Sequence, residues 1–264
     1  MSTANGSQLI DALCRPGVLG APGARVELLE THISWVLLVG DLAYKLKKPL
    51  NLGFLDFSTL EKRRQACLDE LRLNRRLAPE LYLEVVSLTG TPRSPSVGGN
   101  GEILEYAVKM RRFSQSQLMS ERLRTRRLTP ELIDTIAEAV GHFHFSQPAA
   151  DPHSPWGKPD LVWEPVKQNF RHIESTPLAH HYESELLQLF SWSKREFQTK
   201  ISNFEKRREA GFIRECHGDM HLGNMIADNG GVTIFDCLEF NASLRWIDTC
   251  SEVAFLVMDL TDRG

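Results

Sequence analysis

Short runs of apolar and β-branched residues dominate the first third of the chain. Val26 to Val39 and Leu42 to Leu46 are two such runs, and Gly40-Asp41 between them suits a tight turn joining antiparallel strands. Two more runs, Leu81 to Leu88 and Glu102 to Met110, are joined by a segment rich in Gly, Pro and Ser, which is typical of a long turn. The pattern therefore predicts two pairs of β-strands.

One amphipathic helix is predicted between these pairs. Ser58-x-x-Glu61 has the form of a capping box, and Cys67 and Leu71 follow at near-helical spacing until Pro79 stops the pattern. The order strand, strand, helix, strand, strand predicts an antiparallel-sheet lobe with one helix over residues 1–110.

Helical patterns prevail in residues 111–264. Thr129-Pro130-Glu131 combines a cap with proline at the first helical position, and it opens an apolar series that reaches Val140. Two more helices are predicted, from about His181 to Ala210 and from Trp246 to Leu260. We therefore expect an α+β fold whose second lobe, residues 111–264, is mainly helical.

Composition narrows the function classes. The 264 residues are 42% hydrophobic and 25% charged, which is enough to bury a core, and a formal net charge of −3 gives no electrostatic reason to expect a nucleic acid or an anionic membrane as partner. The five cysteines are odd in number and form no Cys-x-x-Cys pair, so neither a disulfide framework nor a thiolate zinc site is expected. Without a basic, apolar leader or a run of roughly 20 apolar residues, we expect a cytoplasmic protein.

The candidate chemistry is concentrated in the segment HGDMHLGNMIADNGG, which the β-prone run Val232 to Phe235 follows. A hairpin with its turn at Asn229-Gly230-Gly231 would bring Asp219, Asn224 and Asp236 to one end of a small sheet. Mg²⁺ prefers such oxygen ligands, and a carboxylate beside the metal can accept the proton of an attacking hydroxyl.

Phosphoryl transfer requires this division of labour, because the protein chiefly positions the reactants and neutralises phosphate charge. It also requires a lysine on the triphosphate. Lys45 ends the second predicted strand, and Glu70, on the predicted helix, could hold that lysine in an ion pair.

Several segments together resemble a known family. HGDMHLGN followed by IFD resembles the active-site signature of aminoglycoside phosphotransferases and choline-kinase-like enzymes, which belong to the protein-kinase-like superfamily. The runs AYKLKKPLNLGFLDFSTLEKRR, ELRLNRRLAPELYLEVV and VKMRRF are similar to an uncharacterised bacterial aminoglycoside-phosphotransferase-like family. Longer members of that family often carry a second, P-loop nucleotide-binding domain. The resemblance extends from about Val26 to Leu260.

The resemblance implies a protein-kinase-like fold in which residues 1–110 bind the nucleotide and the helical lobe supplies the catalytic residues. ATP and Mg²⁺ would bind in the cleft, and the γ-phosphoryl group would pass to a hydroxyl of a small molecule. The site residues that it implies are Asp219 as the catalytic base, Asn224 and Asp236 as metal ligands, Lys45 as the phosphate-pairing lysine, Glu70 as its partner, and Met110 at the nucleotide.

The same resemblance implies an adenine-binding hinge at Tyr106 to Met110 and a supporting role for His217. Two departures from protein kinases are visible. No Gly-x-Gly-x-x-Gly loop occurs where Glu30 to Ser34 stands, and Gly218 and Cys237 replace the arginine and phenylalanine of the kinase motifs. We therefore expect neither control by activation-loop phosphorylation nor activity on protein substrates.

Two other function classes stay open. The absent glycine loop and the short stretch after Asp236, where the second lobe is expected to be incomplete, fit a catalytically inactive, pseudokinase-like nucleotide-binding module of a larger protein. A zinc or iron site would need imidazole ligands, and the candidates are His142, His144, His217 and His221. Residues two apart on a helix point to different faces, so at least one of His142 and His144 is expected to have a core or surface role instead.

Asp248 and Glu252 lie four residues apart on the last predicted helix. They are expected to anchor this helix to the catalytic loop.

Overall fold

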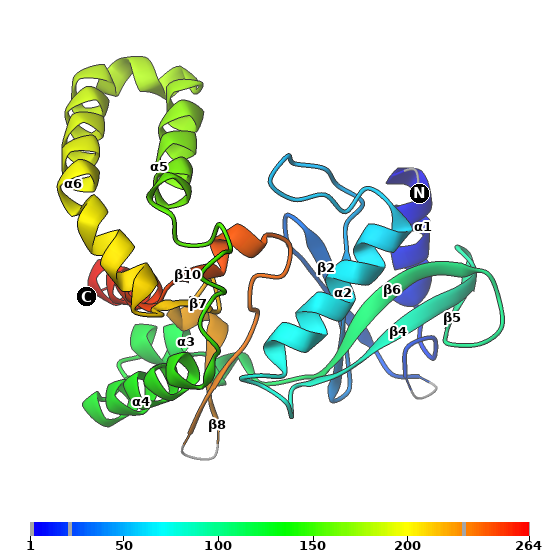
Figure 1. The fold of residues 1–264 in the computed structure, drawn as a ribbon. Helices are drawn as coiled ribbons and strands as arrows, with labels where there is room; N and C mark the ends of the chain where they lie inside the picture. Colours follow the sequence, from blue (N-terminus) through cyan, green and yellow to red (C-terminus); the bar gives the residue numbers. More distant parts are fainter. Residues whose placement is uncertain (1–2, 21–22, 229–230, 264) are drawn as a thin grey trace.

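A six-stranded sheet, in which every neighbouring pair is antiparallel, forms the N-terminal part of the molecule (Figure 1). The structure is a computed structural model that describes residues 3–20, 23–228 and 231–263. The spatial order of the strands is β1-β2-β3-β6-β4-β5. Their bounds are β1 Val26–Glu30, β2 Ser34–Val39, β3 Leu42–Lys47, β4 Tyr82–Thr91, β5 Ser94–Val97 and β6 Ile103–Arg111.

The predicted strand Val26 to Val39 is wrong in one respect, because the chain turns back at Thr31 to Ile33 and forms β1 and β2. The Thr31 hydroxyl accepts a hydrogen bond from the Ser34 backbone N–H at 3.0 Å, which closes this turn locally. The predicted turn at Gly40 is confirmed: Val39 pairs with Leu42, and Gly40 has a positive φ of 54°.

Two helices cover opposite faces of the sheet, α1 (Thr3–Leu13) and α2 (Leu60–Asn74). Alternate strand residues explain the arrangement, because successive side chains in a strand point to opposite faces. One set packs with Leu9, Ile10 and Leu13 of α1 and the other with Cys67 and Leu71 of α2. The α1-facing set contains Leu37, Val39, Tyr44, Leu46 and Ala107, and the α2-facing set contains Val36, Leu38, Ala43, Val108 and Met110.

The predicted helix after the hairpin is confirmed as α2, but its cap is Thr59 rather than Ser58. Thr59 Oγ1 accepts a hydrogen bond from Lys62 N at 3.2 Å, whereas the Ser58 hydroxyl and N–H both bond to Asp56 of the preceding turn. Helix α1 was not predicted.

The C-terminal part is mainly helical, as the sequence predicts, and β-ladders of two strands each join its helices. The helices are α3 Met119–Arg124, α4 Pro130–Ser146, α5 Pro159–Glu174, α6 Glu183–Glu209 and α7 Thr249–Asp262, with short 3₁₀ turns at Gln115–Gln117, Pro177–Tyr182, Leu222–Asn224 and Ala242–Leu244. The strands are β7 Ile213–Glu215, β8 Met225–Asp228, β9 Gly231–Ile234 and β10 Trp246–Asp248, and β7 pairs with β10 while β8 pairs with β9. Within the described ranges, no helix is long and apolar enough to span a membrane.

Two predictions for this part need correction. The helix predicted from Trp246 starts only at Thr249, because Trp246–Asp248 pairs with β7 and the Asp248 side chain then caps the helix through Cys250 N at 2.8 Å. The predicted turn at Asn229 and Gly230 lies outside the described residues.

Helix α5 was not predicted, and with α6 it forms a hairpin that projects away from the sheet (Figure 1). Its inner surface is a ladder of aromatic rings rather than an aliphatic stripe. Trp163 stacks on Phe197 with ring centroids 4.9 Å apart, and Phe170 meets Phe190 edge-on at the same separation. Pro165 inside α5 conceals the helix in the sequence, because proline usually ends a helical pattern.

The α+β class expected from the sequence is thus confirmed, with a curled antiparallel sheet followed by a mainly helical part. The sheet ends at Arg111, next to the predicted division after residue 110, and that division into two lobes stays a prediction. Ile226 and Phe235, from the hairpin β8–β9 and its exit, belong to the same apolar cluster as Cys67 and Met110. The two parts of the chain therefore share core residues.

We expect the sheet to be sensitive to truncation of its α1-facing side. Leu37 is fully buried, and Leu28, its cross-strand partner on β1, is 39% exposed. Leu37→Ala should lower the free energy of unfolding by about 2–5 kcal/mol, because it removes buried methyl groups and leaves a cavity. The matched variant Leu28→Ala should lower it by about 0.5 kcal/mol. Urea unfolding of both variants checks the pair, and equal losses would contradict the burial pattern.

Candidate active site

A cavity of about 490 Å³ lies between the sheet and the segments around Asp219 and Asp236. Lys45 and Met110 line it from the sheet, and Asp219 and Asp236 line it from the C-terminal part. Most of its remaining wall is apolar or comes from the β1–β2 turn, and includes Leu29, Thr31, His32, Ile33, Ser34, Val36, Leu38, Ala43, Phe235 and Leu238. The structure therefore brings four of the predicted site residues to one cavity.

Lys45 lies on β3 with its side chain on the α2-facing side of the sheet. Its ammonium group contacts Glu70 Oε1 at 2.8 Å and also forms an ion pair with Asp236 Oδ1. Burial lowers the pKa of Lys45, but the carboxylates of Asp236 and Glu70 more than offset this and raise the pKa well above its ordinary value. The lysine is therefore charged and held between helix α2 and the segment after β9.

Asp236 follows β9 in a left-handed conformation, with φ of 62°. A non-glycine residue holds such a conformation only where its surroundings over-determine it. Its backbone N–H donates to the Tyr82 hydroxyl at 3.1 Å, and the next N–H, of Cys237, donates to Asn74 Oδ1 at 2.8 Å. The enclosing protein raises the pKa of Asp236, yet the charge of Lys45 outweighs this effect and leaves the pKa below its usual range.

His217 fixes the loop that carries Asp219. Its Nδ1 accepts a hydrogen bond from the Asp219 N–H at 3.2 Å, so the proton is on Nε2, which donates to the Phe235 carbonyl at 2.8 Å. Burial lowers the pKa of His217 and outweighs the opposing charges of Glu252 and Asp236, so the imidazole is neutral. The supporting role predicted for His217 agrees with these contacts.

Asn224 lies behind Asp219 and is 8% exposed. Its amide nitrogen donates to the Asp219 carbonyl at 3.0 Å and to Asp219 Oδ2 at 3.2 Å, which leaves the amide oxygen as the atom it could offer to a metal. The Phe235 N–H donates to the Asn224 carbonyl at 2.9 Å, so the hairpin places Asn224 beside the residue that precedes Asp236. The two predicted metal ligands therefore flank one end of the β8–β9 ladder.

Gly218 and Glu252 join this loop to α7. Gly218 has φ of 88°, and a Cβ atom there would come within 3.0 Å of the Leu244 carbonyl oxygen, so both conformation and space require glycine. Its N–H donates to Glu252 Oε1 at 2.7 Å, while Glu252 Oε2 contacts His144 Nε2 at 2.7 Å. The anchoring role predicted for Glu252 thus has a structural basis, and Asp248 anchors the same helix through its cap and an ion pair with Arg207.

The four histidines considered as metal ligands do not gather around one point. Among the described residues, the group with ligating atoms close together is instead His144, Cys216 and Glu252, which are all buried. The direct contact between the imidazole and carboxylate in this group already pairs the two groups with each other. His142 is exposed on α4, as expected for one member of a pair two residues apart.

His221 faces the carboxylate of Asp219, with Nε2 3.6 Å from Oδ2. Its Nδ1 accepts a hydrogen bond from the Gly223 N–H at 3.0 Å. Interaction with Asp219 raises the pKa of His221 above its ordinary value and outweighs partial burial. The side chains of His221 and Asp219 therefore form a polar pair on this loop.

The predicted hinge Tyr106 to Met110 is only partly at the cavity. Met110 lines the cavity, and the wall continues into Arg111, Arg112 and Phe113, whereas Tyr106 lies further along β6 and accepts a weak hydrogen bond from the Cys67 thiol of α2. The cavity is therefore lined by the end of β6 and the residues that follow it, rather than by the whole predicted hinge.

The pairing of two buried charges next to Lys45 was not predicted from the sequence. Lys47 is 1% exposed and pairs with Glu70 Oε2 at 2.5 Å and with Glu239 Oε1. The sequence contained a signal for a second lysine at this site. Lys47 lies two residues beyond Lys45, so its side chain must be on the same face of the strand. Burial raises the pKa of Glu239, although Lys47 opposes that effect.

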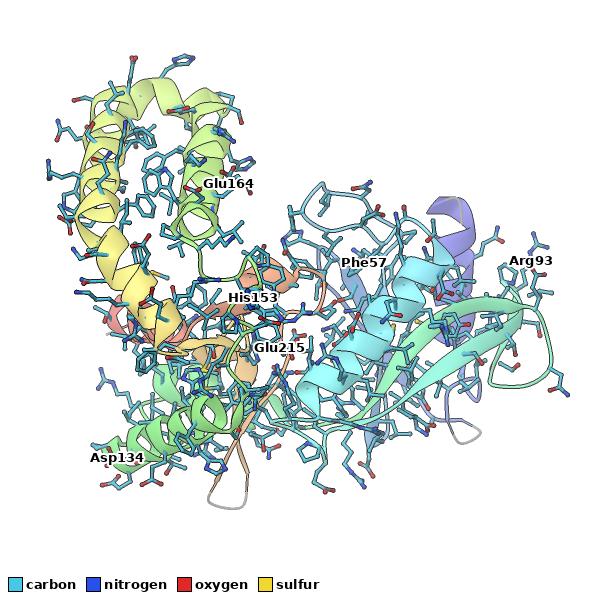
Figure 2. The ribbon with its side chains drawn as sticks, in the orientation of Figure 1. Phe57, Arg93, Asp134, His153, Glu164 and Glu215 are labelled. Carbon is cyan, nitrogen blue, oxygen red and sulfur yellow. The ribbon has the colours of Figure 1, made fainter. Side chains whose placement is uncertain are left out.

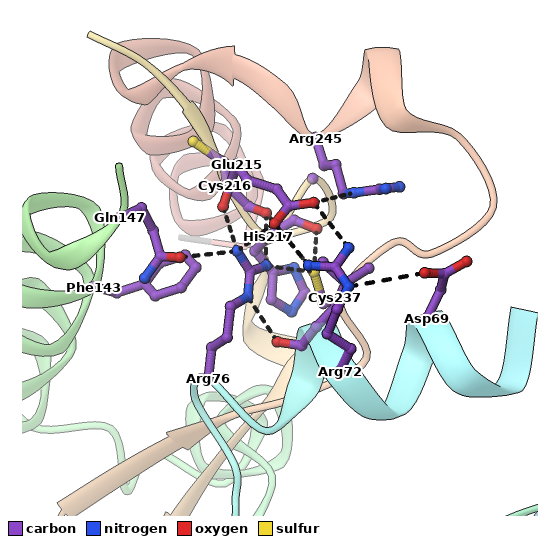
Figure 3. Close-up of polar contacts among 12 residues, drawn as sticks. Asp69, Arg72, Arg76, Phe143, Gln147, Glu215, Cys216, His217, Cys237 and Arg245 are labelled. Atoms are coloured by element: carbon purple, nitrogen blue, oxygen red, sulfur yellow. Dashed lines mark hydrogen bonds and ion pairs between the residues drawn. The ribbon is translucent and has the colours of Figure 1, made fainter. Parts of the chain in front are cut away.

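A second polar cluster, whose contacts were not predicted from the sequence, joins the C-terminal end of α2 to the base of the loop that carries Asp219 (Figure 3). Figure 2 labels its central residue, Glu215, between α2 and the C-terminal elements. Arg72 forms two hydrogen bonds with the Glu215 carboxylate, both at 3.0 Å, and Arg245 adds one at 3.1 Å. Arg76 donates to the carbonyls of Glu215 and Cys216, at 2.6 and 3.2 Å. These charge-assisted bonds fix the base of the loop to α2.

Comparison with known proteins gives relatives of unknown activity. No family model matches the chain. Uncharacterised proteins of Mycobacterium bovis and Mycobacterium tuberculosis are 31% identical over 247 residues, which cover 90% of this chain and 46% of each relative. The chain therefore spans about half the length of the curated relatives it matches. The P-loop domain of longer family members stays a prediction.

Solved structures of small-molecule kinases are also similar to this chain. A choline/ethanolamine kinase family protein from Mesorhizobium loti has a TM-score of 0.43 at 14% identity, over 96% of this chain and 70% of that one. A Plasmodium vivax ethanolamine kinase has a TM-score of 0.46 at 10% identity, over 89% and 60% of the two chains. A glucosamine kinase in complex with glucosamine, ADP and inorganic phosphate has a TM-score of 0.44 at 14% identity, over 100% and 64%. These values do not place the chain in any of the three families.

We expect His217 to make stability depend on pH. Its pKa is lower in the folded protein than the ordinary value of 6.5, so below that pH the unfolded chain binds a proton that the folded protein does not. The stability that His217 contributes must therefore fall as the pH falls from 7 to 5.5. The wild type should lose more unfolding free energy over this interval than His217→Gln, which lacks the titrating group. Urea unfolding at both pH values measures the difference, and identical slopes would contradict a neutral, buried His217.

Proposed function

We propose that the chain is an ATP- and Mg²⁺-dependent phosphotransferase that moves the γ-phosphoryl group to a hydroxyl of a small molecule. The observation that carries the proposal is the placement of Lys45, which is held between Glu70 and Asp236 at the wall of the cavity that Asp219 also lines. Phosphoryl transfer requires a fixed cation at the phosphates, oxygen ligands for a metal and a base near the acceptor.

In this proposal residues 1–110 form the nucleotide-binding lobe. Lys45 contacts the phosphates, Glu70 orients that lysine, and Met110 with the residues that follow β6 lies against the adenine ring. The apolar wall of the cavity supports a flat, hydrophobic base at this end. A cytoplasmic location, where ATP is available, belongs to the same proposal.

Residues 111–264 supply the catalytic side. Asn224 and Asp236 would hold Mg²⁺, and their donor set fits this ion, because it consists of an amide oxygen and a carboxylate whose pKa is lowered. When bound, Mg²⁺ supplies charge neutralisation on the phosphate oxygens. Asp236 can turn from Lys45 towards such an ion without a change of backbone, since its N–H and that of Cys237 are held independently.

Asp219 is the proposed base, which accepts the proton of the acceptor hydroxyl. His217 holds its backbone N–H and Asn224 holds its carbonyl and one carboxylate oxygen, so the side chain is oriented from two sides. The acceptor itself is proposed only as a small molecule bearing a hydroxyl group. The second candidate function is nucleotide binding without turnover, which the glycine-free turn at Thr31 to Ser34 favours.

Asp236→Asn should weaken Mg²⁺-dependent nucleotide binding. Replacing the carboxylate by an amide removes the negative charge that the metal requires, so affinity for ADP in the presence of Mg²⁺ should fall at least ten-fold, which is about 1.4 kcal/mol. Isothermal titration calorimetry with and without Mg²⁺ measures the effect. Asp134→Asn, on the exposed side of α4, is the control and should leave the affinity unchanged. Equal affinities in both variants would refute Asp236 as a ligand.

Asp219→Asn should abolish turnover and spare nucleotide binding. Loss of the base should reduce kcat by about 10²–10⁴-fold, because the amide cannot accept a proton. ADP release across a panel of alcohols, sugars and amino alcohols measures turnover, and calorimetry with Mg²⁺ and ADP measures binding. Full activity in Asp219→Asn would exclude the proposed mechanism, and tight nucleotide binding by a wild type that turns over no acceptor would favour the inactive module.

A further inference from the structure

Glu70 is shared by two lysines. Its Oε1 contacts Lys45 at 2.8 Å, its Oε2 contacts Lys47 at 2.5 Å, and its side chain is fully buried. Apart from these ion pairs, neither oxygen has a hydrogen-bond partner among the described residues. A buried carboxylate without such compensation is strongly destabilised, so Glu70 depends on both ammonium groups.

Lys47 carries this contact onwards to the C-terminal part. Its ammonium group also pairs with Glu239, three residues after Asp236, and lies 5.5 Å from the centre of the Phe57 ring. The Glu239 carbonyl in turn accepts a hydrogen bond from Arg245 at 3.0 Å. Lys47 therefore connects the helix that orients Lys45 with the segment that carries Asp236.

Two positive and three negative side chains make up this group of ion pairs. Lys45 and Lys47 together balance Glu70 and Glu239, and the negative charge of Asp236 is left over for a cation. Lys45 is 11% exposed and lines the cavity, whereas Lys47 is 1% exposed and is not among the residues that line it. Lys45 can thus turn from Asp236 to a phosphate while Lys47 continues to neutralise Glu70.

We infer that Lys47 and Glu239 are positioning residues, which hold Glu70 and the Asp236 segment in register so that Lys45 and Asp236 are free to engage phosphate and metal. The inference rests on the proposed function, since it assigns the pair a role at the same nucleotide site. Lys47 does not line the cavity and acts through Glu70, whereas Glu239 reaches the cavity wall and is held there by its ion pair with Lys47. Their contribution should therefore appear in the gain of ADP affinity that Mg²⁺ produces, rather than in metal-free binding.

The charge-matched double variant Lys47→Met with Glu239→Gln tests the inference. It removes one positive and one negative charge, so the net charge of the group is unchanged, while the connection between the two parts and the second counter-charge of Glu70 are lost. The measurements are the thermal unfolding midpoint and calorimetric titration of ADP with and without Mg²⁺. We expect a folded protein whose Mg²⁺-dependent gain in affinity falls at least about ten-fold, with metal-free ADP affinity unchanged. Lys109→Met is the control. It removes a partly exposed lysine of β6 that pairs with Glu84, and it should retain the full gain.

A folded double variant with the wild-type gain would overturn the positioning role. If the double variant does not fold, Glu239→Asp decides, because it keeps the charge and shortens the reach to Lys47 by one methylene. A gain reduced several-fold in that variant supports the role, and an unchanged gain overturns it. A wild type without any Mg²⁺-dependent gain would remove the proposed function together with this inference, so failure of the role alone remains distinguishable.

Discussion

The burial of Glu70 is the constraint on which the rest of the site depends. A carboxylate with no solvent exposure must be matched by charge, and here the match comes from two lysines of the adjoining strand. One of those lysines reaches Asp236 and the other reaches Glu239. Helix α2, the sheet and the segment after β9 are therefore brought together by a single charged group, and the cavity is formed where they meet.

Helix α2 is held to the C-terminal part at several points besides this group. Asn74, at its last turn, accepts a hydrogen bond from the Cys237 N–H, while Arg72 and Arg76 bind Glu215 and the carbonyls at the base of the loop that carries Asp219 (Figure 3). Tyr82, just beyond, accepts the Asp236 N–H. Breaking the contact of Asn74 or of Tyr82 would leave a buried polar group unpaired, so a displacement of α2 alone would be costly. The arrangement favours a site that is assembled before any ligand binds.

Much of the fold could be predicted from local patterns. The Gly40-Asp41 turn, α2, the two strand pairs and the mainly helical second part each have a cap, a turn dipeptide or a clear periodicity. Other elements were missed: α1 was not recognised, α5 contains Pro165, and β10 interrupts a run that resembles a helix because β7 offers it a pairing edge. Tertiary contacts, which the sequence does not display, determine these elements.

For the site, the sequence identified residue types and order but not how they connect. Lys45, Asp219 and Asp236 were found because their spacing matches a known signature, and the structure places them at one cavity. The roles proposed for them, with those of Asn224 and Met110, stay predictions. The buried pairing of Lys47 with Glu239 was not predicted, because each residue alone resembles an ordinary surface residue. Only the period of two along β3 pointed to a second buried lysine.

The alternation of side chains along β3 also affects how the sheet is assembled during folding. A slip of β3 by one residue would turn Lys45 and Lys47 into the apolar space against α1 and would bring Tyr44 and Leu46 against Glu70. Two ammonium groups would then be buried without a counter-charge and a carboxylate would face hydrocarbon, which makes the slipped pairing very unfavourable. The charges of the site thus also act as a check on strand alignment, so that correct assembly of the sheet and assembly of the cavity become the same event.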